Sequence, residues 1–99
     1  MMMLTSANRK ALPKLYATDG NYEAKAQVKF FTPWTGWTWY AFEFDGEDTF
    51  FGIVDNGSGE KEYGYFSLSE LTSIRGPWGL KIERDRYYTP QTKNQIMQR

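Results

Sequence analysis

A dense aromatic segment at residues 30–51 constrains this chain more than any other feature. The segment holds ten of the eighteen aromatic residues of the sequence, and it begins Phe-Phe-Thr-Pro-Trp-Thr-Gly-Trp-Thr-Trp-Tyr. Residues 37–44 carry aromatic side chains at both alternating sets of positions, which is typical of a strand covered on both faces. Alternation places Trp37, Trp39 and Ala41 on one face, and Thr38, Tyr40, Phe42 and Phe44 on the other. We therefore predict that this strand forms the centre of a small sheet.

Turn signals on both sides of that strand predict an antiparallel meander. Residues 23–31 alternate apolar and polar side chains, as in a half-buried strand, and residues 32–36 form the turn. The Asp-Gly pair at residues 45–46 predicts a second hairpin turn, followed by strands at residues 49–54 and 62–66. In the last of these, Tyr63 is expected to face the core together with Phe66 or Tyr65. The expected fold class is α+β, with an antiparallel sheet of four to five strands.

Two short helices complete the prediction. Thr5 or Ser6 is a suitable N-cap for a helix at residues 7–12 that ends before Pro13. Ser67 and Glu70 have the spacing of a capping box at the start of a helix at residues 68–74. Residues 80–82 are expected to form a short final strand. The 99 residues make one domain, with flexible ends at residues 1–4 and 91–99.

The composition excludes several classes of function. The chain has no histidine and no cysteine, which removes Ser-His-Asp and Cys-His nucleophiles, most zinc sites and disulfide bonds. We therefore expect no enzymatic activity, no cofactor and no metal site. No apolar run approaches the roughly 18 residues that a membrane span needs. A cytoplasmic protein is expected.

The charges are segregated, although the net charge is zero. Residues 41–74 carry a net charge of −7, between flanking segments of +3 and +4. This acidic block is either a solvated surface or a negative face that binds a basic, nucleic-acid-binding partner. The candidate contact residues in its first part are Glu43, Asp45, Glu47 and Asp48.

Two further sets of residues are candidate sites. Trp34 and Trp78 each lie in a turn that contains proline and glycine, where a tryptophan is either an exposed contact for a protein partner or a cap on the end of the sheet. Glu83, Arg84, Asp85 and Arg86 are either an acid–base site tuned by its arginines or a surface ladder of charges. A nucleic-acid interface would use stacked aromatic rings with a basic set comprising Lys25, Lys29, Arg75, Arg84 and Arg86.

Four motifs within residues 30–85 carry a resemblance to a known family, and the resemblance extends over about residues 12–90. They are Phe30-Phe31-Thr32-Pro33-Trp34, Trp37-Thr38-Trp39-Tyr40, residues 64–71 (Gly-Tyr-Phe-Ser-Leu-Ser-Glu-Leu) and residues 79–85 (Gly-Leu-Lys-Ile-Glu-Arg-Asp). In these the chain resembles the bacterial domain-of-unknown-function family 2958 (DUF2958), small proteins of plasmids, phages and integrative elements. The family has no established activity or catalytic residues, so no residue role is carried over. The chain departs from the pattern in its N-terminal methionines and in its polar tail after Pro90.

These features together favour a non-catalytic protein-binding module. The resemblance implies an origin in a mobile genetic element, and hence an inhibitor of a host defence complex of anti-CRISPR or anti-restriction type. The partner would be a host protein complex, bound through the acidic face and the exposed tryptophans. A nucleic-acid-binding accessory protein and a small-molecule or enzymatic site around Glu83, Arg84 and Asp85 are the alternatives.

Overall fold

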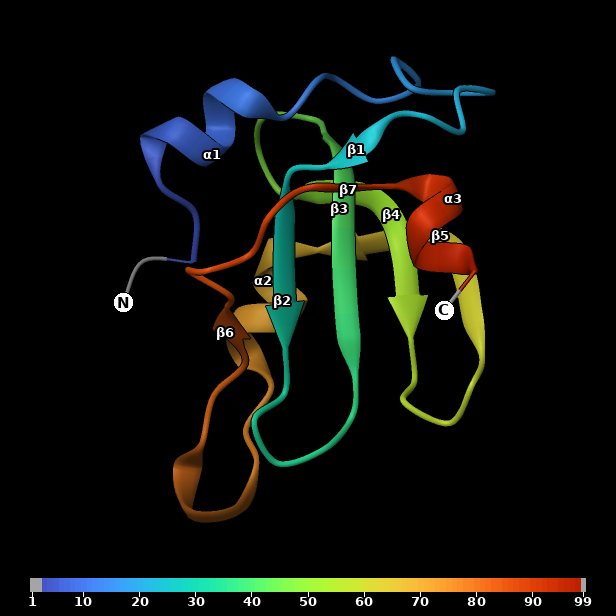
Figure 1. Cartoon of the computed structure of the whole chain (residues 1–99). Helices are drawn as coiled ribbons and strands as arrows, with labels where there is room; N and C mark the ends of the chain where they lie inside the picture. The colour runs from blue at the N-terminus through green and yellow to red at the C-terminus, as the bar shows by residue number, and fades with distance from the viewer. Residues whose placement is uncertain (1–2, 99) are drawn as a thin grey trace.

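The aromatic segment forms the middle of a five-stranded antiparallel sheet (Figure 1). The computed structural model describes residues 3–98. Across the sheet the strands follow the order β5-β4-β3-β2-β6, so four of them form the expected meander and β6 adds to its far edge. The strands are β2 (Val28–Phe31), β3 (Thr38–Phe44), β4 (Thr49–Asp55), β5 (Lys61–Ser67) and β6 (Glu83–Arg84).

Short helices and a second, two-stranded sheet surround this meander. The helices described within residues 3–98 are α1 (Ser6–Ala11), α2 (Leu68–Ser73) and α3 (Lys93–Met97), with a 3-10 turn at Pro77–Gly79. β1 (Lys25–Ala26) pairs with β7 (Gln91–Thr92). Side chains of Thr5, Ser67 and Thr92 cap the three helices by accepting a bond from the backbone amide three residues later. The α+β fold class and the two predicted helix starts are thereby confirmed.

A β-bulge in β3 changes which side chains share a face. The register against β4 shifts between Ala41 and Glu43, so that Phe42 is the extra residue. Phe42 and Glu43 consequently lie on one face. Phe44 returns to the face of Ala41, whereas strict alternation had placed it with Phe42. Because sequence periodicity contains no signal for a bulge, the face predicted for Phe44 was wrong.

The sheet is covered on both faces, as expected for its central strand. The first core contains Phe30, Trp39, Phe44 and Phe50, and residues near α1 and α2, among them Leu12 and Leu71, cover it. The rings of Phe44 and Phe50 stack with centroids 4.5 Å apart. The second core lies on the opposite face and consists of Ala26, Tyr40, Phe42, Ile53 and Ile96, with Tyr88 packed against it.

The polar C-terminal segment is part of the fold, and this corrects the prediction of a flexible end. Residues 91–97 form β7 and α3, and Ile96 is completely buried in the second core. Gln95 completes a capping box with Thr92, which stabilises the first turn of α3 although this helix has only five residues. One apolar side chain among polar neighbours gave no periodic signal. At the other end Leu4 is also buried, while residues 1, 2 and 99 lie outside the described part of the chain.

Three further predictions differ from the structure. Residues 80–82 form a single bridge, Arg75 to Lys81, and the strand lies instead at Glu83–Arg84. The strand expected at residues 23–31 is broken at Gln27, whose amide donates to the Ala41 carbonyl. Tyr63 and Tyr65 are exposed, and only Phe66 of β5 enters the core. Within residues 3–98, no helix has the length and apolar character that crossing a membrane requires.

Candidate functional site

Five aromatic side chains form an exposed surface on one side of the molecule, which we call the tyrosine face. Phe51 comes from β4, Tyr63 and Tyr65 come from β5, and Tyr16 and Tyr22 come from the segment before β1. β1, β7 and α3 cover part of this sheet face, where Ile96 of α3 packs against β3 and β4 and Lys93 lies beside the Tyr63 ring of β5. The exposed fractions are 70% for Tyr16, 60% for Tyr22, 55% for Tyr65 and 39% for Tyr63.

Direct ring contacts join three side chains of the tyrosine face, and Tyr16 and Tyr22 border the hollows beside them. The Phe51 ring stacks on Tyr63 with centroids 6.1 Å apart and meets the Tyr65 ring edge-on at 5.1 Å. The pairing of Phe51 with Tyr65 across the two strands places these rings side by side. Two shallow hollows of about 160 and 150 Å³ open on this face, and both are lined by Phe51 and Asp19. The surface is therefore a contoured patch of rings rather than a set of separate side chains.

Buried Glu43 holds the loop that carries Tyr16. Only 2% of Glu43 is exposed, and its carboxylate accepts bonds from the Tyr16 amide at 2.7 Å, the Thr18 amide at 2.8 Å and the Thr18 hydroxyl. A buried carboxylate requires such donors, because an unsatisfied charge inside a protein is costly. Tyr16 has a φ of 71°, a conformation that most residues avoid, so these bonds hold a strained turn in place.

Buried Lys93 holds the same loop from the other side. Its Nζ donates to the Thr18 carbonyl at 2.6 Å, and it lies 5.6 Å from the Phe42 ring centroid and 5.9 Å from that of Tyr63. Cations near aromatic faces are attracted by the ring quadrupole. Thr18 therefore joins β3 to α3 through Glu43 and Lys93, and the base of the tyrosine face is rigid.

The pKa values of two tyrosines on this face, Tyr63 and Tyr65, are raised by their surroundings. A hydrogen bond with the Tyr16 hydroxyl raises the pKa of the Tyr65 phenol above its ordinary value of 10, and the nearby carboxylates of Glu43 and Asp19 add to the shift. Partial burial raises the pKa of Tyr63, with a smaller contribution from Tyr22. Both groups stay neutral at physiological pH, so the face presents rings and neutral hydroxyl groups.

The structure does not gather the predicted acidic residues into one contact surface. Glu43 is buried below the tyrosine face. Asp45 accepts bonds from the amides of Glu47, Asp48 and Thr49, and these bonds lower the pKa of Asp45 from its ordinary value of 3.8. Asp48 binds the Ser69 amide and hydroxyl, each at 2.8 Å, at the start of α2. Of the four, Asp45 and Glu47 are exposed, and Glu47 is the one that accepts none of these bonds.

The two predicted tryptophans behave differently. Trp78 is 98% exposed at the tip of the Pro77–Gly79 turn. Trp34 is half-buried and packs against the first core and against Gly76, where an added Cβ would lie 2.3 Å from the Trp34 ring. Trp34 therefore joins two turns at one end of the sheet, and Trp78 extends from the second of them.

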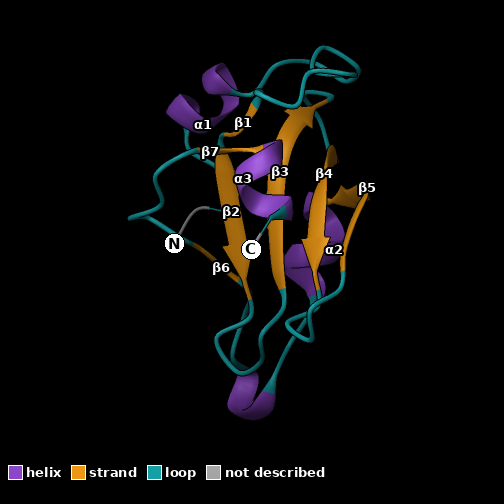
Figure 2. Ribbon diagram, turned by 45° about the vertical axis from the view of Figure 1, so that its right-hand side comes forward, coloured by secondary structure: helices purple, strands orange, loops and turns teal. Residues whose placement is uncertain are grey.

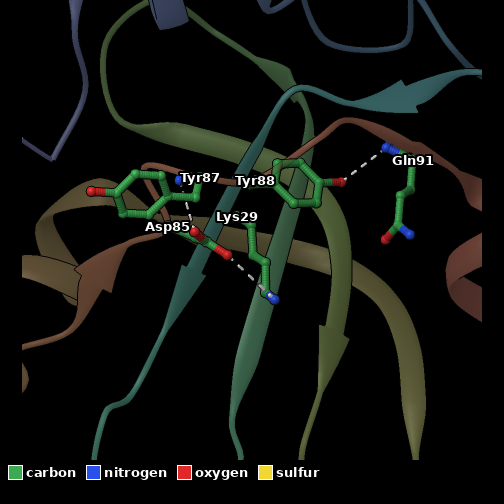
Figure 3. A network of polar contacts seen from close by, with 5 residues as sticks. All are labelled: Lys29, Asp85, Tyr87, Tyr88 and Gln91. Atoms are coloured by element: carbon green, nitrogen blue, oxygen red, sulfur yellow. Dashed lines mark hydrogen bonds and ion pairs between the residues drawn. The ribbon is translucent and has the colours of Figure 1, made fainter.

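The charged residues after β6 form structural pairs. Asp85 lies 3.6 Å from Lys29 and accepts a bond from the Tyr87 amide, and the Tyr88 hydroxyl accepts one from the Gln91 amide (Figure 3). Glu83 and Arg84 lie in β6 beside β2, while Arg86 is exposed. A shallow hollow of about 200 Å³ borders this segment, lined by Phe31, Tyr87 and residues 83–86.

Of the basic residues of the nucleic-acid hypothesis, Lys29, Arg84 and Arg86 lie in or beside the β2–β6 pair, whereas Lys25 lies in β1 and Arg75 follows α2. Lys29 pairs with Asp85, and Arg75 donates to the carbonyls of Thr72 and Ile74 at the end of α2. Neither lines the hollows of the tyrosine face. Among the described residues, no group of three or more acidic side chains is arranged to hold a metal ion.

The tyrosine face was missed from the sequence because its residues come from three separate segments. The sequence prediction places Tyr63 in the core and leaves Tyr65 as the alternative to Phe66 there. The signal that was available is the alternation itself: Phe66 and Tyr65 must lie on opposite faces, and only one face could be the first core.

Comparison with curated proteins and with solved structures finds no match. The family model described as "Protein of unknown function (DUF2958)" matches residues 3–96. The match extends beyond the four motifs in the sequence, and it includes most of α3 and therefore both Ile96 and the buried Lys93. This chain belongs to the DUF2958 family of proteins of unknown function.

Proposed function

We propose that this protein is a non-catalytic protein-binding module whose contact surface is the tyrosine face. One observation carries the proposal: four exposed tyrosines and the half-buried Phe51, from three segments, form one surface over a buried, hydrogen-bonded base. Tyrosine supplies a large contact area at a low cost in side-chain entropy, and it is enriched among residues that dominate binding energy. A surface serving stability alone would gain nothing by exposing so many rings.

The charges around this face favour a basic partner. Asp19 lines both hollows of this face, exposed Glu60 and Glu62 lie on the opposite side of β5 at the same edge of the sheet, and Glu47 and Glu70 are exposed in the segments next to β4 and β5. Complementary charge increases the rate at which a basic partner associates. A nucleic acid is disfavoured, because its phosphates would be repelled by the same carboxylates.

As the class of partner we propose a host defence or nucleic-acid-processing complex, of the kind inhibited by anti-CRISPR or anti-restriction proteins. Such complexes present basic surfaces to nucleic acid, and an acidic protein with aromatic contacts is suited to occupying them. The resemblance to small proteins of plasmids and phages supports this choice.

Photocrosslinking in cells tests the proposal. A benzoylphenylalanine at position 22 lies on the tyrosine face, and one at position 87 is a matched control, because Tyr87 is 90% exposed and borders a different hollow. We expect discrete protein adducts from position 22 and none of the same mass from position 87. Equal adducts from both positions would contradict the proposal.

Once a partner is purified, substitutions measure the contribution of the face. We expect Tyr22→Ser and Tyr65→Ser each to weaken binding by about tenfold or more, and Tyr87→Ser to leave it unchanged. The charge is tested with Glu47→Lys and Glu62→Lys. Asp48 is unsuitable for this test, because its carboxylate caps α2. Wild-type binding by both tyrosine variants would refute the proposal.

A further inference from the structure

β5 presents an unpaired edge directly beside the tyrosine face. It is the last strand of the sheet and pairs with β4 alone. Figure 2 shows β5 at the outer margin of the described chain, with no other element beyond it. A seven-residue edge strand is a template for pairing with another chain, and proteins usually block such edges with proline, a bulge or a covering element. None of the three is present along β5 within the described residues.

The register shows which backbone groups point outward. The Leu68 amide donates to the Asp48 carbonyl at 2.8 Å and the Asn56 amide donates to the Glu60 carbonyl at 3.1 Å, at the two ends of the β4–β5 pair. Hydrogen-bonding residues alternate along an antiparallel strand, so the intervening even-numbered residues of β5 turn toward β4. The amides and carbonyls of Tyr63 and Tyr65 therefore point away from the sheet.

The two sides of this edge differ in chemistry. On one side lie the rings of Tyr63 and Tyr65, which continue into the tyrosine face. On the other side lie the carboxylates of Glu60 and Glu62, with Trp37 and Val54 beside them. Gly64 lies between Glu62 and Phe66 on that second side, and open space surrounds the position of its missing side chain. A strand added to β5 would find an aromatic surface on one side and negative charge on the other.

We propose that β5 accepts an extended segment of the partner as an additional strand, and that this segment alternates apolar with basic residues. The inference rests on the proposed function and specifies how the partner binds. Alternate side chains of a strand point to opposite faces, so apolar residues would contact the tyrosines while basic residues would lie near Glu60 and Glu62. Backbone hydrogen bonds supply affinity in such strand addition, and side chains supply specificity.

A second copy of this chain is a poorer occupant of the same edge. Antiparallel pairing of two β5 strands about Gly64 would bring together two sets of Glu60, Glu62 and Glu70, with Lys61 as the only basic residue that residues 60–70 contribute. Each Glu62 would then lie opposite Phe66 of the other copy, with no basic residue to receive its charge, and the summed negative charge of the two edges would oppose association. A basic segment would instead be attracted by the same carboxylates.

A pair of variants at one position separates the two proposals. Tyr65→Ala removes the ring but keeps the outward amide, and Tyr65→Pro removes both. Proline is tolerated on an edge strand where its nitrogen faces solvent. With the purified partner, we expect Tyr65→Pro to bind at least about tenfold more weakly than Tyr65→Ala, as loss of one well-placed hydrogen bond and its geometry implies. Equal weakening would refute strand addition and leave the binding face intact, whereas no weakening by either variant would refute the binding face itself.

A peptide experiment on the wild-type protein gives an answer even if Tyr65→Pro fails to fold. The probe is a blocked seven-residue peptide of alternating lysine and valine, and its matched control alternates glutamate and valine. Amide exchange followed by NMR reports on Tyr63 and Tyr65 directly. We expect protection of both amides by millimolar lysine peptide and none by the glutamate peptide. No protection, or equal protection by both peptides, would overturn the proposal, as would a concentration-dependent dimer that protects the same amides without peptide.

Discussion

The buried carboxylate of Glu43 is the group whose removal should affect this protein most. Its three hydrogen bonds reach across 25 to 27 residues of chain and fix the Tyr16–Thr18 loop against β3. The left-handed conformation of Tyr16 is strained and persists only while these bonds hold it, so the loop would leave it once they are lost. We therefore predict that substitution of Glu43 both destabilises the fold and disorders one side of the tyrosine face.

The expected magnitude follows from the donors left without an acceptor. Each buried donor without a partner costs about 1–3 kcal/mol, and Glu43→Ala leaves three of them. Because part of the loop can turn toward water, we expect a total loss of about 3–4 kcal/mol in the free energy of unfolding. Glu43→Gln keeps one acceptor oxygen but loses the charge, so we expect about 2 kcal/mol. These are large fractions of the roughly 5–15 kcal/mol that stabilises a typical domain.

Thermal and urea unfolding of the two variants measure these losses, with Glu47→Gln as the matched control. Glu47 is exposed on the turn that follows the same strand, so its substitution should change stability by less than about 0.5 kcal/mol. Glu43→Ala should lower Tm by roughly 12 °C or more in a chain of this size. Amide exchange at Tyr16 and Thr18 should increase in both Glu43 variants. A Glu43→Ala protein within about 1 kcal/mol of wild type, with both amides still protected, would refute the reasoning.

Three further predictions concern other parts of the fold. Gly76→Ala places a Cβ 2.3 Å from the Trp34 ring and should lower the free energy of unfolding in urea by about 1–3 kcal/mol. The matched Gly64→Ala, whose Cβ meets nothing within 4 Å, should be nearly neutral, and equal losses of stability in the two variants would contradict the packing of Trp34. The pKa of Asp45 is lowered by three backbone amides, so its contribution to stability is present above about pH 3.8 and is lost as the pH falls through the lowered pKa. Asp45→Asn should therefore weaken the dependence of stability on pH in the acid range, and an unchanged dependence would count against these bonds. The pKa of Tyr65 is raised, chiefly by its bond with Tyr16, so the contribution of this bond to stability is complete below about pH 10 and is lost as the pH rises through the raised pKa. An absorbance titration of phenolate should show a late-titrating group that disappears in Tyr65→Phe. If that group persists in the variant, it belongs to another residue.

Local patterns in the sequence predicted most of the meander correctly. The Asp-Gly turn, the period-two strands and the caps at Thr5 and Ser67 are all signals within a few residues of one another, and the structure has each of them. The family was recognised from four motifs of the same local kind. The end of the chain escaped prediction because α3 depends on one buried side chain, Ile96, and on the second core that receives it.

The candidate site could not be predicted in the same way. Glu43 and Asp48 looked like members of an acidic surface, but a carboxylate is an acceptor, and the fold brings amides from distant segments to both. Trp34 and Trp78 have similar sequence surroundings, yet one packs on Gly76 and the other points into solvent. The residues adjacent in sequence therefore do not reveal which carboxylates accept bonds from distant amides or which tryptophan is packed.

The aromatic segment shows where sequence information ends and tertiary structure begins. By itself the sequence determined a central antiparallel strand covered on both faces, because a strand with apolar side chains on both faces must bury both of them. Only the tertiary structure decided which rings stay exposed. The bulge at Phe42 turns Glu43 beneath the loop of Tyr16, and α3 covers just part of that face, so Phe51, Tyr63 and Tyr65 remain open beside an unpaired edge. That outcome depends on contacts between segments far apart in the chain, which no local periodicity records.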